Sequence, residues 1–274
     1  MIMTEKDVRH GSLIKQDLKR MFSEPYIYIS FVLSMIILLH PFKGIWNEKT
    51  PATFMQLLSM PFGISDFPPF AAIFCVIPFA GSFCEDYNSG YINFTILRTG
   101  VSKYAFQRCT TVLLSGGILM SSVVSATIAV CAVLANAPDT EETIAFMRHT
   151  IWAREGVILM CHGLIFSILK ILLAFLFGAV WAGVGLVISV LSANSYVTYI
   201  CPFVIYQILW FALEGSAFNP EYYLRGDADF IPSFGFAVIY QSILIAICFL
   251  VSFKGIRERV KYNGNCGKKG IFAN

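Results

Sequence analysis

The sequence predicts an all-α membrane protein with six transmembrane helices, an N-terminal amphipathic interfacial helix and a short cytoplasmic coupling helix. Two observations predict this class. Of the 274 residues, 57% are hydrophobic and only 14% are charged, whereas soluble domains carry about 25% charged residues. Apolar runs also recur at lengths near the roughly 20 residues that cross a bilayer. The net charge of +3 is too small to indicate nucleic-acid binding.

Each apolar run is expected to be helical, because backbone polar groups in lipid must be satisfied within the segment. The expected spans cover residues 25–46, 67–84, 109–137, 157–191, 196–214 and 230–253. Pro25 suits the first helical position, Pro78 is expected to kink the second span, and the polar stretch 192–195 separates the fourth span from the fifth. Residues 1–274 then form a single transmembrane domain without a nucleotide-binding domain.

Residues 10–24 have the pattern of an amphipathic helix. Ile14, Leu18, Met21 and Phe22 fall on one face, and most of the charged residues lie off it. Such a helix can lie in the membrane interface ahead of the first span. A disordered tail is the alternative.

Lysine and arginine are distributed unevenly between the two sides of the predicted topology. Fourteen of them fall in the N-terminal segment, the linker 85–108 and the C-terminal tail, and five fall in the opposite loops. Cytoplasmic loops carry the excess of basic residues. Both termini and the linker are therefore predicted to be cytoplasmic.

Metal and catalytic motifs are absent from the sequence. Six of the eight cysteines lie in or beside apolar runs and no pair has CxxC spacing, while the four histidines form no HExxH motif. Cysteines in this setting act as small buried hydrophobic residues. We predict no metal site, no catalytic residue and no cofactor in this chain.

The linker between the second and third spans has the strongest functional pattern. Gly90 and Gly100 bracket a stretch long enough for a helix of two to three turns, with Tyr87, Tyr91 and Phe94 on one face at i, i+4 and i+7. An exposed aromatic face of this kind suits docking of a soluble partner. It equally suits an interfacial helix whose rings lie among lipid headgroups.

This linker resembles the corresponding linker of type-2 ABC exporter permeases, the membrane subunits of ATP-binding-cassette transporters. The residues that carry the resemblance are Glu85, Gly90, Leu97-Arg98, Ser102-Lys103-Tyr104 and Arg108. The predicted layout of the whole chain is similar to the same family, and stretches such as 183–189 and 219–221 look like its small Gram-positive peptide and drug exporters. The chain departs from the pattern at Gly100, where the family often has proline, and at Tyr91, where it often has threonine.

The resemblance implies a transport subunit and not an enzyme. The chain has no GxxxxGK[ST] motif, so a separate ABC ATPase dimer would bind ATP and Mg²⁺, and a second permease copy or a homologous permease would complete the pathway. The implied location is the plasma membrane of a Gram-positive bacterium, and the implied cargo is an antimicrobial or toxin peptide, a lipid or a drug. The residues expected to couple to the ATPase are Glu85, Asp86, Gly90, Tyr91, Phe94, Leu97 and Arg98.

The fifth span carries one continuous aromatic face. It consists of Tyr199, Phe203, Tyr206 and Trp210, at spacings of 4, 3 and 4. The resemblance places this span, with the second, at the subunit interface and the translocation pathway. Ordinary helix packing or lipid contact is the alternative.

Lys170 is the only basic residue deep in a predicted span. We expect its long side chain to snorkel to the outer interface or to pair with a carboxylate such as Glu155 or Glu214, in preference to binding cargo.

Two other classes of protein remain as alternatives. A secondary transporter would need carboxylates near the middle of its spans, and no predicted span contains one. A membrane-embedded enzyme would need paired histidine and acidic residues in the spans, and these are also missing from the sequence. Co-purification with an ATPase would separate both from an ABC permease.

Overall fold

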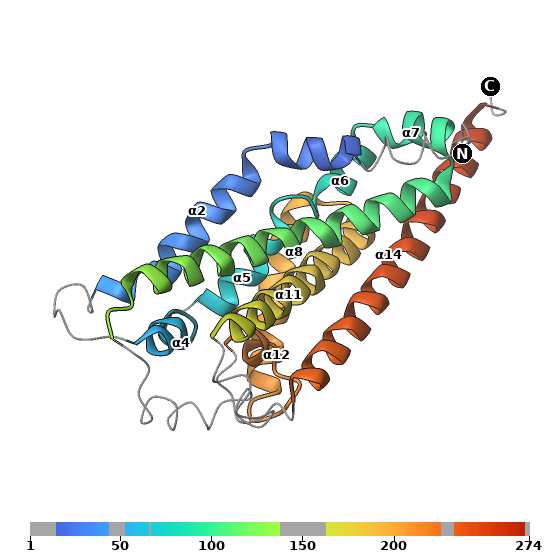
Figure 1. The fold of residues 1–274 in the computed structure, drawn as a ribbon. Coiled ribbons are helices and arrows are strands. Elements are labelled where there is room, and N and C mark those ends of the chain that lie inside the picture. Colours follow the sequence, from blue (N-terminus) through green and yellow to red (C-terminus); the bar gives the residue numbers. More distant parts are fainter. Residues whose placement is uncertain (1–14, 44–52, 66, 138–162, 226–232, 272–274) are drawn as a thin grey trace, which may run out of the picture.

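The computed structural model describes residues 15–43, 53–65, 67–137, 163–225 and 233–271 (Figure 1). Apart from one isolated parallel bridge between Thr53 and Ala137, the regular elements within these ranges are helices. They are an N-terminal helix Lys15–Ser23, α2 (Tyr26–Leu39), α4 (Phe54–Ile64), α5 (Phe67–Val76), α6 (Ser82–Asn88), α7 (Tyr91–Thr99), α8 (Val101–Leu134), α11 (Gly163–Ser192), α12 (Ser195–Ala212), α13 (Pro220–Arg225) and α14 (Phe234–Ile271).

Four of the described helices are long and apolar enough to cross a membrane: α8, α11, α12 and α14. The N-terminal helix and α2 meet at a bend of 57° and would give a fifth span if they are taken as one. The all-helical class predicted from the sequence is therefore confirmed, and the apolar helices are compatible with a membrane-embedded protein. The described residues give four or five candidate spans, so the predicted number of six is not confirmed.

The second predicted span, 67–84, is not one continuous helix. α5 ends at Val76, the chain turns through residues 77–81, and α6 begins at Ser82. Pro78 lies in this turn, where it has no N–H to continue the helical hydrogen bonds. The expected kink is a complete break, and the ten residues of α5 reach only about 15 Å. The preceding helix, α4, was not predicted.

Other predicted boundaries also needed correction. α2 ends at Leu39 and is shorter than 25–46, α8 begins at Val101 and not at residue 109, and α14 continues to Ile271, past the predicted end at 253. Helical hydrogen bonds do not stop where the apolar run stops, so charged turns extend α8 and α14. The prediction for α12 is confirmed to within two residues at each end. Residues 44–46, 157–162 and 230–232 of the predicted spans lie outside the described residues.

α11 is the central helix of the bundle and packs against α8, α14, α12 and α5. The α8–α11 contact is very close: a Cβ placed on Gly116 would lie 2.4 Å from the carbonyl oxygen of Gly178 and 2.5 Å from Cβ of Ala182. The small residues Gly178 and Ala182, four apart on α11, therefore allow the two backbones to meet.

One end of the bundle brings together segments that are far apart in sequence. The N-terminal helix, α6, α7 and the last turns of α14 gather there (Figure 1). The turn between α11 and α12 joins them, because Asn88 donates a hydrogen bond to the carbonyl of Ala193 (3.3 Å) and Arg259 donates one to the carbonyl of Leu191. We call this the α7 end.

Candidate functional site

The predicted linker helix is present as α7, and glycines set both of its ends. Gly90 has φ +73° and Gly100 has φ +83°, a conformation that residues with side chains rarely adopt. Ile92 is buried and Ile96 packs against the core, so the inner face of α7 is fixed to the bundle. The exposed side chains of the helix, which we call its outer face, are Tyr91, Asn93, Phe94, Leu97 and Arg98.

That outer face exposes three large apolar side chains beside the polar Asn93 and Arg98. Tyr91 is 49%, Phe94 72% and Leu97 86% exposed. The sequence pattern had also assigned Tyr87 to this face, which is wrong. Tyr87 lies on α6, before the Gly90 turn, where it stacks on Phe83 with ring centroids 5.9 Å apart and lies under the guanidinium of Arg259.

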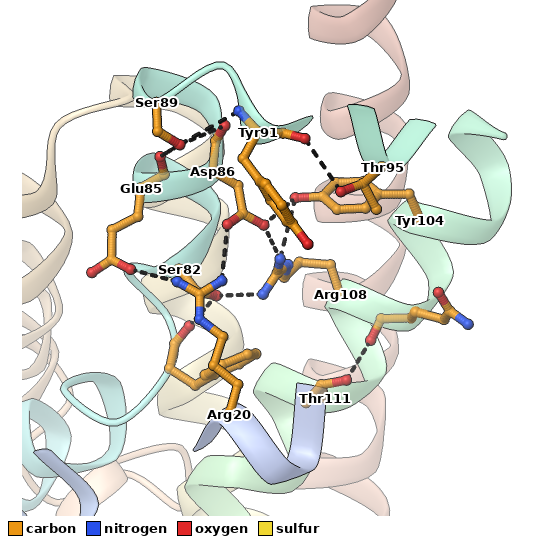
Figure 2. Close-up of polar contacts among 12 residues, drawn as sticks. Arg20, Ser82, Glu85, Asp86, Ser89, Tyr91, Thr95, Tyr104, Arg108 and Thr111 are labelled. Carbon is orange, nitrogen blue, oxygen red and sulfur yellow. Dashed lines mark hydrogen bonds and ion pairs between the residues drawn. The ribbon is translucent and has the colours of Figure 1, made fainter. Parts of the chain in front are cut away.

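Beneath α7, a network of ion pairs converges on the carboxylate of Asp86 (Figure 2). Arg20 donates to Oδ1 at 2.9 Å, while Arg108 and the hydroxyl of Tyr104 donate to Oδ2, the latter at 3.1 Å. The donors come from the N-terminal helix and from α8, and Asp86 comes from α6. We call Arg20, Ser82, Glu85, Asp86, Tyr104 and Arg108 the Asp86 network.

Arg108 is fully enclosed by this network. Besides the Asp86 carboxylate, its guanidinium reaches Ser82 Oγ at 3.0 Å and lies 5.2 Å and 5.4 Å from the ring centroids of Phe79 and Tyr104. A buried charge of this kind is tolerated only with such compensation, and removing one partner costs about 3–5 kcal/mol. Arg108 and Asp86 therefore hold α6 and α8 in one arrangement.

Arg20 extends the network to the N-terminal helix. It bonds Glu85 at 3.0 Å and its own-helix neighbour Glu24 at 3.1 Å, in addition to Asp86. Of the predicted apolar face, Met21 is buried and Leu18 packs on the core, but Phe22 is exposed; Ile14 lies outside the described residues. In the sequence pattern Arg20 falls largely off this apolar face, and in the structure its side chain reaches α6.

An open cavity of about 750 Å³ lies between these helices and α7. Its wall includes Asp17, Arg20, Asp86 and Arg108, together with Tyr91 and Phe94 from α7. Burial raises the pKa of Glu85, also in the wall, more than the attraction of Arg20 lowers it. The cavity therefore opens beside α7, and the exposed residues Tyr91 and Phe94 border it together with the charged side chains.

The structure therefore brings together part of the predicted coupling set. Glu85 and Asp86 belong to the Asp86 network, Gly90 begins α7, and Tyr91, Phe94, Leu97 and Arg98 lie on its outer face. Sequence reasoning did not find the network itself. The only local signals were two i, i+4 pairs of polar residues, Ser82 with Asp86 and Tyr104 with Arg108.

Three of the four predicted aromatic residues of α12 contact different neighbours in the bundle. A Cβ on Gly81 would lie 2.2 Å from the hydroxyl of Tyr199, so Tyr199 lies across the break between α5 and α6. Phe203 stacks on Phe70 of α5 (5.9 Å between centroids). Tyr206 is fully buried against Trp181 of α11.

Trp210 belongs to the opposite end of the bundle. Its Nε1 donates to the Glu221 carboxylate at 2.5 Å, and its carbonyl accepts from Asn219. The face of α12 that is exposed is a separate apolar stripe, made of Tyr196, Ile200, Val204 and Ile208.

Of the two expectations for Lys170, snorkelling is wrong, whereas pairing with a carboxylate stays a prediction, since Glu155 lies outside the described residues. Lys170 is only 5% exposed, and its Nζ lies 4.1 Å from the ring centroid of Phe62 on α4. The helix α4, absent from the prediction, covers it. Among the described residues, no group of three histidine, cysteine or acidic side chains is placed to hold a metal ion.

Comparison with known proteins gives no match: no protein-family model, curated protein or solved structure is similar to this chain. The class that the fold defines is a helical membrane protein in which the Asp86 network underlies an outward-facing short helix.

Proposed function

We propose that this chain is the membrane-spanning permease subunit of an ATP-driven ABC exporter. The observation that carries the proposal is α7, a short helix isolated between two glycines, whose outer face exposes Tyr91, Phe94 and Leu97. Large exposed apolar side chains at one end of a bundle favour contact with another protein. In this proposal, a dimeric ATPase that binds ATP and Mg²⁺ docks on that face.

The Asp86 network supplies the mechanical connection. Movement of α7 would be transmitted to α6 through the Gly90 turn and to α8 through the Gly100 turn, with Ile92 holding α7 to the bundle. Asp86 and Arg108 join α6 to α8. Arg20 adds the N-terminal helix to the same unit. Nucleotide-driven motion of the partner would therefore tilt several helices together, as a rigid element with two positions.

The proposed orientation puts the α7 end in the cytoplasm. The basic residues of the N-terminal segment, the linker and the C-terminal tail favour this side. The N-terminal helix then lies along the inner interface, and the chain resides in the plasma membrane of a Gram-positive bacterium.

The proposed cargo is amphipathic or hydrophobic: an antimicrobial or toxin peptide, a lipid or a drug. It would pass between this chain and a second permease, identical or homologous, near α12 and α5. Tyr199, Phe203, Tyr206 and Trp210 remain the proposed pathway or interface residues. Because Tyr206 is buried against Trp181, it could meet cargo only after α12 moves away from α11.

The test is affinity purification of the tagged chain from its native membrane, followed by identification of the bound chains and assay of ATP hydrolysis. The proposal expects an ATPase with a Walker A motif to co-purify. The double variant Phe94→Ala with Leu97→Ala should lose that partner and yet fold normally, because both side chains are exposed. Val133→Ala is the matched control, since Val133 on α8 is 84% exposed. A complete complex without ATPase activity that transports on an ion gradient would overturn the proposal.

A further inference from the structure

A second cavity lies among α11, α12, α13 and α14, well away from the Asp86 network. Its volume is about 260 Å³. α11 packs along both α12 and α14, but those two helices make little contact with each other. The cavity occupies the space between them, and none of the described residues that line it is charged.

The walls of this cavity are apolar, and five of the residues that line it are aromatic. Phe177 and Trp181 of α11 lie on one side, with ring centroids 6.2 Å apart. Tyr223 and Phe218 each lie 5.3 Å from the ring of Tyr240 on the other side. Such walls favour a flat, apolar molecule. The volume is slightly below the roughly 300 Å³ at which typical small-molecule sites begin, so the molecule would be compact.

One polar side chain, Gln241 of α14, lines this apolar space. It is 2% exposed, and neither its Nε2 nor its Oε1 has a hydrogen-bond partner among the described residues. A buried amide without partners destabilises the protein. A ligand that offers a hydroxyl or amide group would remove this penalty.

We propose that the cavity binds a compact, uncharged, ring-containing amphiphile whose single hydroxyl or amide group bonds Gln241. The aromatic walls select the apolar body, and Gln241 selects the polar group. The site adjoins the proposed pathway face of α12: Ile205 and Leu209 line it, and its wall residue Trp181 contacts Tyr206. The inference does not depend on an ATPase partner.

The test compares 2-naphthol with naphthalene, which has the same rings without the hydroxyl. Binding of each radiolabelled compound to the full chain in lipid nanodiscs is measured by equilibrium dialysis, and uptake by empty nanodiscs is subtracted. The proposal expects saturable binding of both compounds, with an affinity about tenfold higher for 2-naphthol than for naphthalene. This difference corresponds to one hydrogen bond between the naphthol hydroxyl and the buried amide of Gln241.

Three variants make this result specific. Gln241→Met keeps the size of the side chain and should bind both compounds equally, and it should fold because it removes the unpaired amide. Val184→Trp should fill the cavity and abolish binding of both. Ser242→Ala, at an exposed position of α14, should keep the tenfold preference.

Three outcomes would overturn the inference: no saturable binding, equal affinities in the unmodified chain, or a preference that persists in Gln241→Met. None of them bears on the proposed ATPase docking, which is tested at α7.

Discussion

Arg108 and Asp86 form a charge pair that is almost completely removed from solvent, with side chains 2% and 3% exposed. Their neighbour Glu85 also pairs with an arginine, but its side chain is 46% exposed. Two adjacent carboxylates on α6 thus have very different environments. A comparison of substitutions at the two positions therefore measures how much the buried pair contributes to the free energy of unfolding.

Asp86→Ala should lower the free energy of unfolding by about 3–5 kcal/mol, because Arg108 is left buried without its counter-charge. Glu85→Ala should cost less than about 1 kcal/mol, the range for exposed pairs. Chemical unfolding in detergent micelles measures both. Similar losses for the two variants would mean that the Asp86 network does not join α6 to α8 as described.

The turn between α7 and α8 explains one departure from the permease pattern. Gly100 has φ +83°, and its N–H donates to the carbonyl of Ile96 at 2.8 Å. Proline fixes φ near −65° and has no N–H, so the proline common in that family does not fit this backbone.

Gly100→Ala should cost about 1–3 kcal/mol of unfolding free energy from the backbone conformation alone, since Gly100 has φ +83° and ψ 150° and a Cβ there meets no atom within 4 Å. Gly100→Pro should cost more, because the hydrogen bond to Ile96 is lost as well. Gly235→Ala is the control, with an open position and no positive φ. A Gly100→Pro variant as stable as the unmodified chain would contradict this geometry.

Close contact of α8 with α11 at Gly116 and Gly178 predicts low tolerance of side chains there. A Cβ on Gly178 would lie 2.2 Å from the carbonyl oxygen of Gly116, and the backbone can relieve this only by moving. Gly178→Ala should destabilise the bundle by about 1–3 kcal/mol through overpacking. The thermal midpoint of unfolding in detergent checks this, and an unchanged midpoint would show that the helices are farther apart.

The raised pKa of Glu85 predicts a pH dependence of stability. Because the folded chain holds this proton more tightly than the unfolded chain does, the contribution is present below the unfolded pKa of about 4.3 and is lost as pH rises through the higher folded value. Glu85→Gln should reduce the fall in unfolding free energy across that window. If the unfolding free energy of the unmodified chain and of the Glu85→Gln variant changed with pH in the same way, Glu85 would be no more buried in the folded chain than in the unfolded one.

Local signals in the sequence were sufficient for some elements. The polar break before α12 includes Asn194, whose side chain accepts a hydrogen bond from the N–H of Tyr196 at 2.9 Å and caps the helix. The glycines at 90 and 100 likewise delimit α7. In both cases, the residue type itself fixes the backbone where an element begins or ends.

Long-range contacts could not be found in this way. Arg20 and Asp86 are 66 residues apart, and no spacing rule relates residues on different helices. The inward direction of Tyr206 depends on where α11 lies, and the burial of Lys170 depends on α4. Hydropathy detects that a segment is apolar, but not which neighbour covers it.

The most direct test of the central claim, that α7 docks an ATPase, is site-specific photocrosslinking in the native membrane. A photoreactive phenylalanine analogue would replace Leu97 on α7 and, as the control, Ile243 on the exposed face of α14. The account predicts that the probe at position 97 crosslinks a chain containing a Walker A motif and that the probe at 243 does not. A probe at position 97 that crosslinks only lipid, or reacts from the external medium, would contradict it.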